Sequence, residues 1–161
     1  MYQVELKRAL IQHLFSPEEG WSVVVHLDPM ELARGGSHPS GKAEAAQDCV
    51  EWFHEKGVRM EVDREYGKAD LVARHPDHGI VIIEVEGKSR RLRTQAFYSA
   101  LGQSLVRKYG SMPHAKYGLA VPNTDKWRVL VNRVPQRLFR ELEIDVFFVS
   151  LDGVERLSLR R

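Results

Sequence analysis

The feature that most constrains this fold is a predicted β-hairpin over residues 66–88. Two strand-forming runs, residues 69–74 and 80–86, flank a His-Pro-Asp-His-Gly turn in which Pro76 and Gly79 supply a restricted and a permissive backbone. The second run opens with four apolar residues in succession, which is typical of a strand buried on both faces. We therefore expect this hairpin at the centre of the fold.

Charged side chains occupy unusual positions in the hairpin. Asp70 stands at the start of the first strand. Glu84, Glu86 and Lys88 take every second position at the end of the second, so one pleated face would present all three at intervals of about 7 Å. Carboxylates at the end of a buried strand are costly to desolvate unless a positive charge meets them, and a divalent cation would provide that charge.

Length and composition predict a single globular domain over residues 1–161, because 43% of the residues are hydrophobic and 29% are charged. No apolar run is long enough to span a membrane, and no cleavable signal is evident at the start. The single cysteine, Cys49, excludes an internal disulfide and a cysteine-based zinc site. We expect a cytoplasmic protein without a membrane partner.

The formal net charge of +2 conceals two halves of opposite sign. Residues 1–86 hold 16 acidic and 9 basic residues, whereas residues 87–161 hold 6 acidic and 15 basic ones. The change of sign falls at the carboxylates themselves, and residues 87–124 contain no acidic residue. A metal site beside a cationic surface suits a polyanion such as a nucleic acid. The simpler alternative is a chance grouping of charges on solvated faces.

The remaining pattern predicts alternating helices and strands. Helices are expected at residues 2–15, 42–56, 91–109 and 125–142, and strands at residues 21–27, 58–62, 117–121 and 144–150. Residues 58–62 are expected to form the first strand of the sheet, and Pro135 to interrupt or restart the last helix. Gly102 predicts a close approach between its helix and a neighbouring element.

The predicted helix over residues 91–109 carries a polar stripe with a repeat of four. Its members are Arg91, Gln95, Ser99, Gln103 and Arg107. The stripe is compatible with plain solvent-exposed surface. Because it starts beside the carboxylates and ends in an arginine, it is equally compatible with a surface that follows a phosphate backbone.

Three other kinds of site have weaker support. Residues 36–42 fit the phosphate-loop spacing G-x-x-x-x-G-K, but Ala43 follows without the hydroxyl that would bind magnesium. The close pair His75 and His78 falls in the hairpin turn, which favours surface residues over metal ligands. Cys49 falls on the predicted apolar face of its helix, which favours packing over a role as nucleophile.

The order helix, strand, hairpin, helix, strand resembles the PD-(D/E)XK nuclease superfamily, whose restriction-endonuclease-like fold also includes archaeal-type Holliday junction resolvases. Residues 41–57 resemble its first helix, residues 69–72 its second-strand motif, residues 83–87 its third-strand motif and residues 100–103 an A-x-G-Q pattern on the next helix. The resemblance implies an α/β fold: a central mixed sheet flanked by helices, with an α-β-β-β-α-β core at residues 41–122. Additional elements would be an N-terminal helix and strand and a C-terminal helix and strand.

The resemblance also implies a function. Mg²⁺ or Mn²⁺ would be bound by Asp70, Glu84, the main-chain carbonyl of Val85 and Glu44. The reaction would be hydrolysis of phosphodiester bonds in nucleic acid, with DNA as the expected substrate, in defence, repair or recombination. The nucleic acid would contact a set of basic and amide side chains: Arg90, Arg91, Arg93, Gln95, Gln103 and Arg107.

One position departs from the family pattern. Glu86 stands where lysine is usual, although some restriction endonucleases of this fold carry a glutamate there, as a ligand or general base. Lys88 is a candidate for the cationic role, so Asp70, Glu84, Glu86 and Lys88 are the expected catalytic residues. The alternative is a catalytically weak or inactive module that binds nucleic acid or a protein. A homodimer through residues 144–150 or the N-terminal helix is also expected from the small size.

Overall fold

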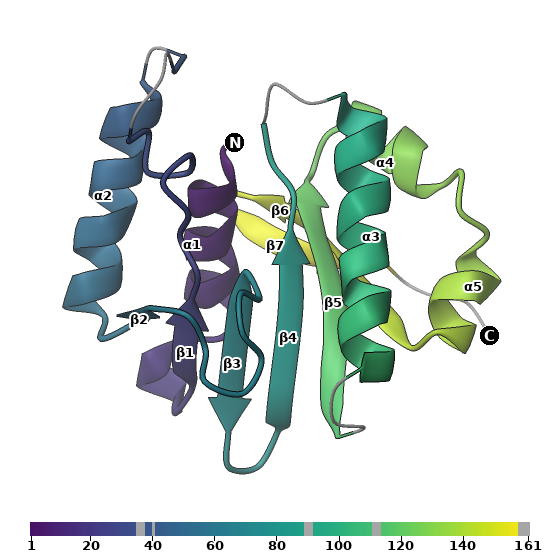
Figure 1. The fold of residues 1–161 in the computed structure, drawn as a ribbon, viewed down its shortest axis with the longest axis horizontal. Coiled ribbons are helices and arrows are strands. Elements are labelled where there is room, and N and C mark those ends of the chain that lie inside the picture. Colours follow the sequence, from purple (N-terminus) through teal and green to yellow (C-terminus); the bar gives the residue numbers. More distant parts are fainter. Residues whose placement is uncertain (35–37, 40, 89–91, 111–113, 158–161) are drawn as a thin grey trace.

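The computed structural model describes residues 1–34, 38–39, 41–88, 92–110 and 114–157. Its described residues form a mixed seven-stranded sheet in the order β2-β1-β3-β4-β5-β6-β7 (Figure 1). In chain order the strands are β1 (Ser22–Val25), β2 (Arg59–Met60), β3 (Leu71–His75), β4 (Gly79–Val85), β5 (Ala115–Pro122), β6 (Ile144–Ser150) and β7 (Gly153–Arg156). The predicted hairpin is β3 and β4, and it lies in the middle of the sheet.

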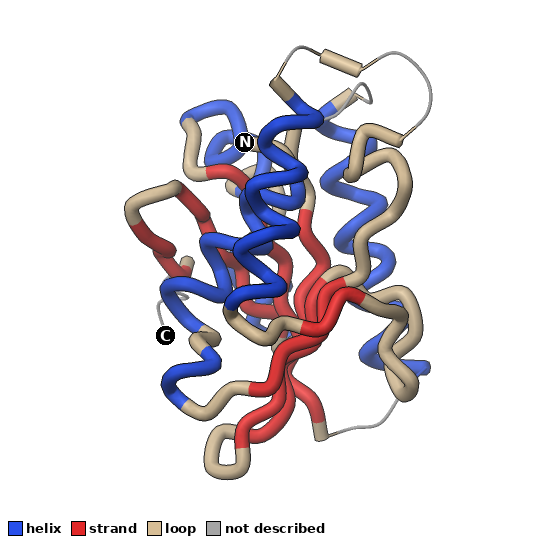
Figure 2. Tube along the Cα trace, turned by 90° about the vertical axis from the view of Figure 1, so that its left-hand side faces the viewer, coloured by secondary structure: helices blue, strands red, loops and turns tan. Residues whose placement is uncertain are grey.

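Helices cover both faces of this sheet, as the turned view in Figure 2 shows. They are α1 (Gln3–Leu14), α2 (Lys42–Glu55), α3 (Arg93–Gly110), α4 (Asp125–Val131) and α5 (Gln136–Glu141), with a short 3₁₀-helix η1 (Pro17–Glu19) after α1. Strand side chains alternate between the two cores, so that Val72 and Ile82 pack on the side of α3 to α5, whereas Leu71 and Ile83 pack on the side of α1 and α2. The predicted fold class, a mixed α/β sheet flanked by helices, is confirmed.

The strand pairing fixes which ends of the strands meet. β3 and β4 are antiparallel, with Leu71 opposite Ile83, and β4 and β5 are parallel, with Ile83 opposite Gly118. A Cβ atom on Gly118 would lie 2.7 Å from the Phe147 ring of β6, so only glycine fits there without a shift. The start of β3 and the end of β4 therefore lie together at one end of the sheet.

The predicted first strand is wrong in extent and in place. Only Arg59–Met60 forms β2, which pairs in parallel with β1 at the edge of the sheet. β1 instead lies next to β3, in the interior of the sheet. The chain leaves β2 because Asp63 organises a turn: its Oδ1 accepts the N–H groups of Glu65 and Tyr66 at 3.0 and 2.9 Å.

The helix that covers the sheet beside the hairpin is α1, not α2. Val4, Leu6, Leu10 and Ile11 of α1 are all buried. α2 packs on α1 and contacts the sheet through the edge strand β2, so it lies further out (Figure 1). The additional N-terminal helix and strand are present as α1 and β1, and α1 covers the sheet while α2 packs on the outside of α1.

The two segments expected at a dimer interface are engaged within the chain. β6 pairs with β5 on one side and with β7 on the other. α1 is packed between the sheet and α2. Pro135 does interrupt the last helix, because α4 ends at Val131 and α5 begins at Gln136. None of the helices in the described part of the chain has the length and apolar character that crossing a bilayer requires.

Candidate functional site

Asp70 and Glu84 meet at the end of the sheet where β4 finishes. Asp70 directly precedes β3 and Glu84 is the last residue but one of β4, and the two strands are antiparallel. Asp70 Oδ2 accepts the backbone N–H of Val85, the residue after Glu84, at 2.9 Å, and the Asp70 carboxylate raises the pKa of Glu84 by repulsion. The structure therefore brings two of the predicted metal ligands together.

Glu84 is a buried acid in an unfavourable environment for its charge. Burial and repulsion by the Asp70 carboxylate together raise the pKa of Glu84 to about 7, against the opposing effect of Arg107. Arg107 of α3 donates from Nε to Glu84 Oε1 and from Nη1 to the carbonyl of Tyr66 at 2.9 Å. This predicted nucleic-acid contact thus turns inward and offsets the charge of Glu84.

Lys7 of α1 reaches the same site from the other face of the sheet. Its ammonium group is fully buried and lies 3.0 Å from Asp70 Oδ1. It also donates to both carboxylate oxygens of Glu31, at 2.7 and 2.8 Å, and to the carbonyl of His26 at 2.7 Å. Burial acts to lower the pKa of Lys7, but Asp70 and Glu31 together raise it above its ordinary value, so the group remains an ammonium.

Neither Lys7 nor Glu31 is among the site residues expected from the sequence. Lys7 had a usable signal, because a helix places it on the same face as the buried Val4, Leu10 and Ile11. Glu31 had none, since it lies in the loop that follows β1. Its contact with Lys7 depends on the packing of that loop against α1.

Glu86 and Lys88 follow the last residue of β4 in the chain. They lie next to the N-terminal end of α1. Gln3 Nε2 donates to the Val85 carbonyl at 2.9 Å and to Glu86 Oε2 at 3.2 Å. The Lys88 N–H donates to the Met1 carbonyl at 2.8 Å, and its ammonium lies 5.4 Å from the centre of the Tyr2 ring. Because the strand ends at Val85, strand alternation no longer directs these two side chains.

A cleft of about 390 Å³ is lined by Glu86 and Lys88. Tyr2, Lys42 and Glu31 also line it, so Glu31 connects this cleft to the Lys7 ammonium. The ammonium of Lys42 lies 5.9 Å from the centre of the Tyr2 ring, so both Lys42 and Lys88 are close to this ring. The predicted catalytic residues are thus divided between the Asp70–Glu84 pair and this neighbouring cleft.

The other predicted contacts are spread over two helices. Glu44 is exposed in the first turn of α2. Arg93, Gln95 and Gln103 are exposed on α3, as expected of residues that meet a large ligand, whereas Arg90 and Arg91 lie outside the described residues. The close approach predicted at Gly102 is wrong, because no atom of another described element lies within 4 Å of the position a Cβ would take there.

The carboxylate oxygens of Asp70 and Glu84 are the type of ligand that a hard divalent cation binds. Mg²⁺ in proteins is commonly held by one or two carboxylates, with water and substrate phosphate completing its shell. The residues that the structure describes contain no group of three or more His, Cys, Asp or Glu side chains arranged to hold a metal. A cation at this pair would therefore take few ligands from the protein and several from water or substrate.

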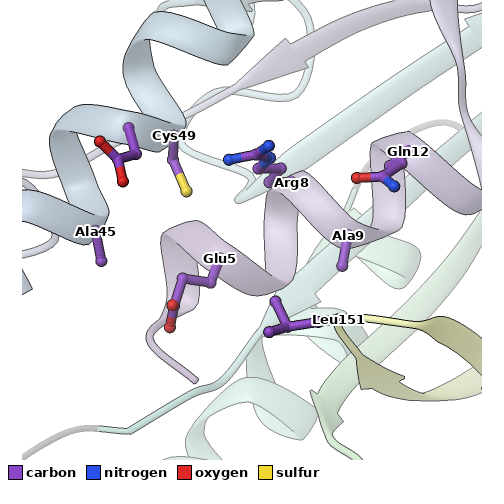
Figure 3. Close-up of a pocket in the computed structure, with 8 residues that line it drawn as sticks. Glu5, Arg8, Ala9, Gln12, Ala45, Cys49 and Leu151 are labelled. Atoms are coloured by element: carbon purple, nitrogen blue, oxygen red, sulfur yellow. The ribbon is translucent and has the colours of Figure 1, made fainter.

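A separate cavity of about 340 Å³ lies between α1 and α2. Figure 3 shows Glu5 and Arg8 of α1 facing Cys49 of α2 across it, with Leu151 at one side. Burial raises the pKa of the Cys49 thiol to about 11, so the thiolate form is scarce at neutral pH. The interpretation of Cys49 as a packing residue agrees with this environment.

Comparison with known proteins finds no matching family model and no matching curated protein. Two solved structures are similar along nearly the whole chain. One is an XisH family protein from Nostoc punctiforme, with 17% identity, a TM-score of 0.50, and coverage of 96% of this chain and 95% of that chain. The other is an fdxN element excision controlling factor protein from Anabaena variabilis, with 16% identity, a TM-score of 0.51, and 98% of each chain covered. At these identities the likeness is one of fold.

Proposed function

We propose that this chain is a metal-dependent nuclease that hydrolyses phosphodiester bonds of DNA, with Asp70 and Glu84 as its metal-binding pair. The observation that carries the proposal is the position of Asp70 beside the buried Glu84 at the end of β4, where Asp70 accepts the N–H of the next residue, Val85. Neighbouring carboxylates repel each other, and such arrangements are concentrated at functional sites.

The chain's own residues prepare this pair for a cation. The Val85 N–H fixes the orientation of Asp70, and the antiparallel pairing of β3 with β4 fixes the separation of the two backbones. Arg107 and Lys7 offset part of the negative charge from opposite faces of the sheet. When bound, Mg²⁺ or Mn²⁺ would lower the pKa of a water molecule and neutralise charge that develops on the phosphate.

Two further observations favour DNA as the substrate. Arg93, Gln95 and Gln103 are exposed on α3, and positive and amide groups are the usual contacts to phosphate oxygens. One protein of similar fold is named as an fdxN element excision controlling factor. The exposed basic and amide side chains of α3 would then face the nucleic acid.

A second candidate function is a nuclease-fold module that binds nucleic acid or a protein without cutting. It is favoured by the internal cations, since Arg107 is paired with Glu84, and Lys7 with Asp70. It is also favoured by Glu86, whose carboxylate accepts a hydrogen bond from Gln3 in the neighbouring cleft. In this alternative the two ion pairs serve the stability of the fold alone.

One experiment separates the two functions. Supercoiled, linear and branched DNA, and an RNA of matched length, are incubated with the protein in Mg²⁺, in Mn²⁺ or in EDTA, and binding is measured separately by a gel-shift assay. Cutting that requires the metal and is lost in Asp70→Asn and in Glu84→Gln, but not in the exposed-acid control Glu55→Gln, supports the nuclease. Binding without cutting in any of these metals supports the module, and the absence of both overturns both.

A further inference from the structure

The Lys7 ammonium has more hydrogen-bond acceptors around it than it has N–H groups to donate. An ammonium group carries three N–H donors. Four oxygens lie within 3.0 Å of Lys7 Nζ: the His26 carbonyl at 2.7 Å, Glu31 Oε1 and Oε2 at 2.7 and 2.8 Å, and Asp70 Oδ1 at 3.0 Å. The contact to Asp70 is the longest of them. Lys7 can therefore release Asp70 and still keep one acceptor for each of its N–H groups.

Glu31 is held in position by its own loop. Asp28 Oδ1 accepts the N–H groups of Met30 and Glu31, at 2.7 and 2.9 Å, and so fixes the backbone from which the Glu31 side chain extends. The Glu31 side chain is only 6% exposed, and both of its oxygens are directed at Lys7. A buried carboxylate with this placement keeps its cation close, because separating the two would leave each charge unpaired.

The balance of charge explains why Lys7 needs a second anionic partner. With Asp70 alone as counterion, the ammonium would compete with any divalent cation for the same carboxylate, and the two positive charges would repel each other at short range. Glu31 adds a second negative charge to Lys7, which donates to both of its carboxylate oxygens. Lys7 can then stay where it is when Asp70 takes another cation.

We propose that Glu31 is a positioning residue that holds the Lys7 ammonium so that Asp70 can bind a divalent cation. The Lys7–Glu31 pair thereby sets the metal affinity of the Asp70–Glu84 pair. This inference rests on the proposed function, because it requires a cation at Asp70 and Glu84. It assigns to α1 and to the loop after β1 a role in metal binding through residues that are not themselves ligands.

Mn²⁺ is the probe for the test, titrated calorimetrically into the whole protein without nucleic acid. In Glu31→Gln, Lys7 has Asp70 as its only anionic partner, so Mn²⁺ binding should weaken by at least about tenfold. In Lys7→Met/Glu31→Gln the competing charge is also gone, so the affinity should return to within about threefold of the wild type. The control Glu55→Gln, at an exposed acid in the last turn of α2, should bind as the wild type does.

The double variant distinguishes this proposal from a direct role for Glu31. If Glu31 were itself a metal ligand, Lys7→Met/Glu31→Gln would bind Mn²⁺ as weakly as Glu31→Gln, and the proposal would be overturned. Lys7→Met alone leaves two buried carboxylates without their cation and is not needed for the comparison. Thermal unfolding of each variant, measured first, shows which proteins are folded.

A second readout connects metal affinity to cutting. The Mn²⁺ concentration for half-maximal DNA cleavage should rise in Glu31→Gln, while the rate at saturating Mn²⁺ stays within about threefold of the wild type. Wild-type protein that binds no Mn²⁺ overturns the proposed metal pair and this inference together. If the wild-type protein cuts DNA but binds Mn²⁺ no more tightly than Glu31→Gln does, this inference is overturned and the proposed function is not.

Discussion

Arg107 donates a hydrogen bond from Nε to Glu84 Oε1, which joins the last third of α3 to the end of β4. This ion pair is internal, although the polar stripe of the sequence places Arg107 among the residues expected to meet nucleic acid. Its side chain is 23% exposed and that of Glu84 is 3% exposed, so the arginine forms the boundary between the buried acid and solvent. The Arg107–Glu84 ion pair thus affects both the stability of the fold and the charge of the site.

The first prediction concerns the loss of this arginine. Arg107→Gln leaves the buried Glu84 carboxylate without its cation, so at about pH 8 the free energy of unfolding should fall by about 3 kcal/mol. At about pH 5.5 the loss should be smaller, because Glu84 can then be protonated. Urea denaturation at both pH values measures the difference. Equal stability of variant and wild type at the higher pH would show that the ion pair contributes nothing.

The second prediction concerns the pH dependence of stability without divalent cations. Burial raises the pKa of Glu84 to about 7, so the folded protein keeps a proton that the unfolded chain releases at lower pH. The free energy of unfolding should therefore fall as pH rises from the ordinary carboxyl range to about 7, and level off above that. Glu84→Gln should flatten much of this slope in EDTA. A residual slope is expected from Glu31, whose pKa burial also raises.

Added Mg²⁺ provides the control for this assignment. A cation bound to Glu84 competes with the proton, so the stabilisation by Mg²⁺ should be larger at about pH 8 than at about pH 5.5. Asp70→Asn should abolish that difference. If the free energy of unfolding depends on pH in Glu84→Gln as it does in the wild type, the titrating group is not Glu84.

Much of the fold is encoded in local patterns. The sequence predicts strands at residues 69–74 and 80–86, and β3 (Leu71–His75) and β4 (Gly79–Val85) differ from these limits by two residues or fewer. Strand alternation and turn residues are short-range signals, which is why the hairpin is readable. Residues 58–62 have strand-forming character as well, but the turn around Asp63 ends β2 after two residues. Arg74 of β3 also donates to the Asp63 carboxylate, at 2.7 and 2.9 Å, so a tertiary contact holds this turn in place.

The site is predictable only in part for the same reason. Asp70 and Glu84 stand out because a carboxylate at the end of a buried strand is unusual within its own segment. The contact between Lys7 and Glu31 joins residues 24 positions apart, and no local pattern encodes it. A lysine on an apolar helix face ordinarily extends its head group to water, so its burial follows only from the arrangement of three segments.

The third prediction concerns the chemistry of Cys49. Burial raises the pKa of the thiol to about 11, and the residue is 3% exposed. Labelling with an aromatic disulfide reagent at about pH 8 should therefore be at least about a hundredfold slower in the native protein than in urea. Cys49→Ser provides the unlabelled control. Rapid labelling of the native protein would mean that the cavity between α1 and α2 opens readily and exposes the thiol.

The last prediction separates surface arginines by their position on the fold. Arg93 is exposed in the first turn of α3, so Arg93→Gln should weaken DNA binding and reduce the slope of log affinity against log salt concentration by about 1. Arg59 is 53% exposed on the edge strand β2, separated from β4 by β1 and β3, so Arg59→Gln should leave both quantities unchanged. Fluorescence anisotropy over a range of salt concentrations measures them without requiring cleavage. Equal effects of the two substitutions would indicate that DNA is attracted by net charge alone, whereas a selective effect of Arg93 places the strand along α3, beside Asp70 and Glu84.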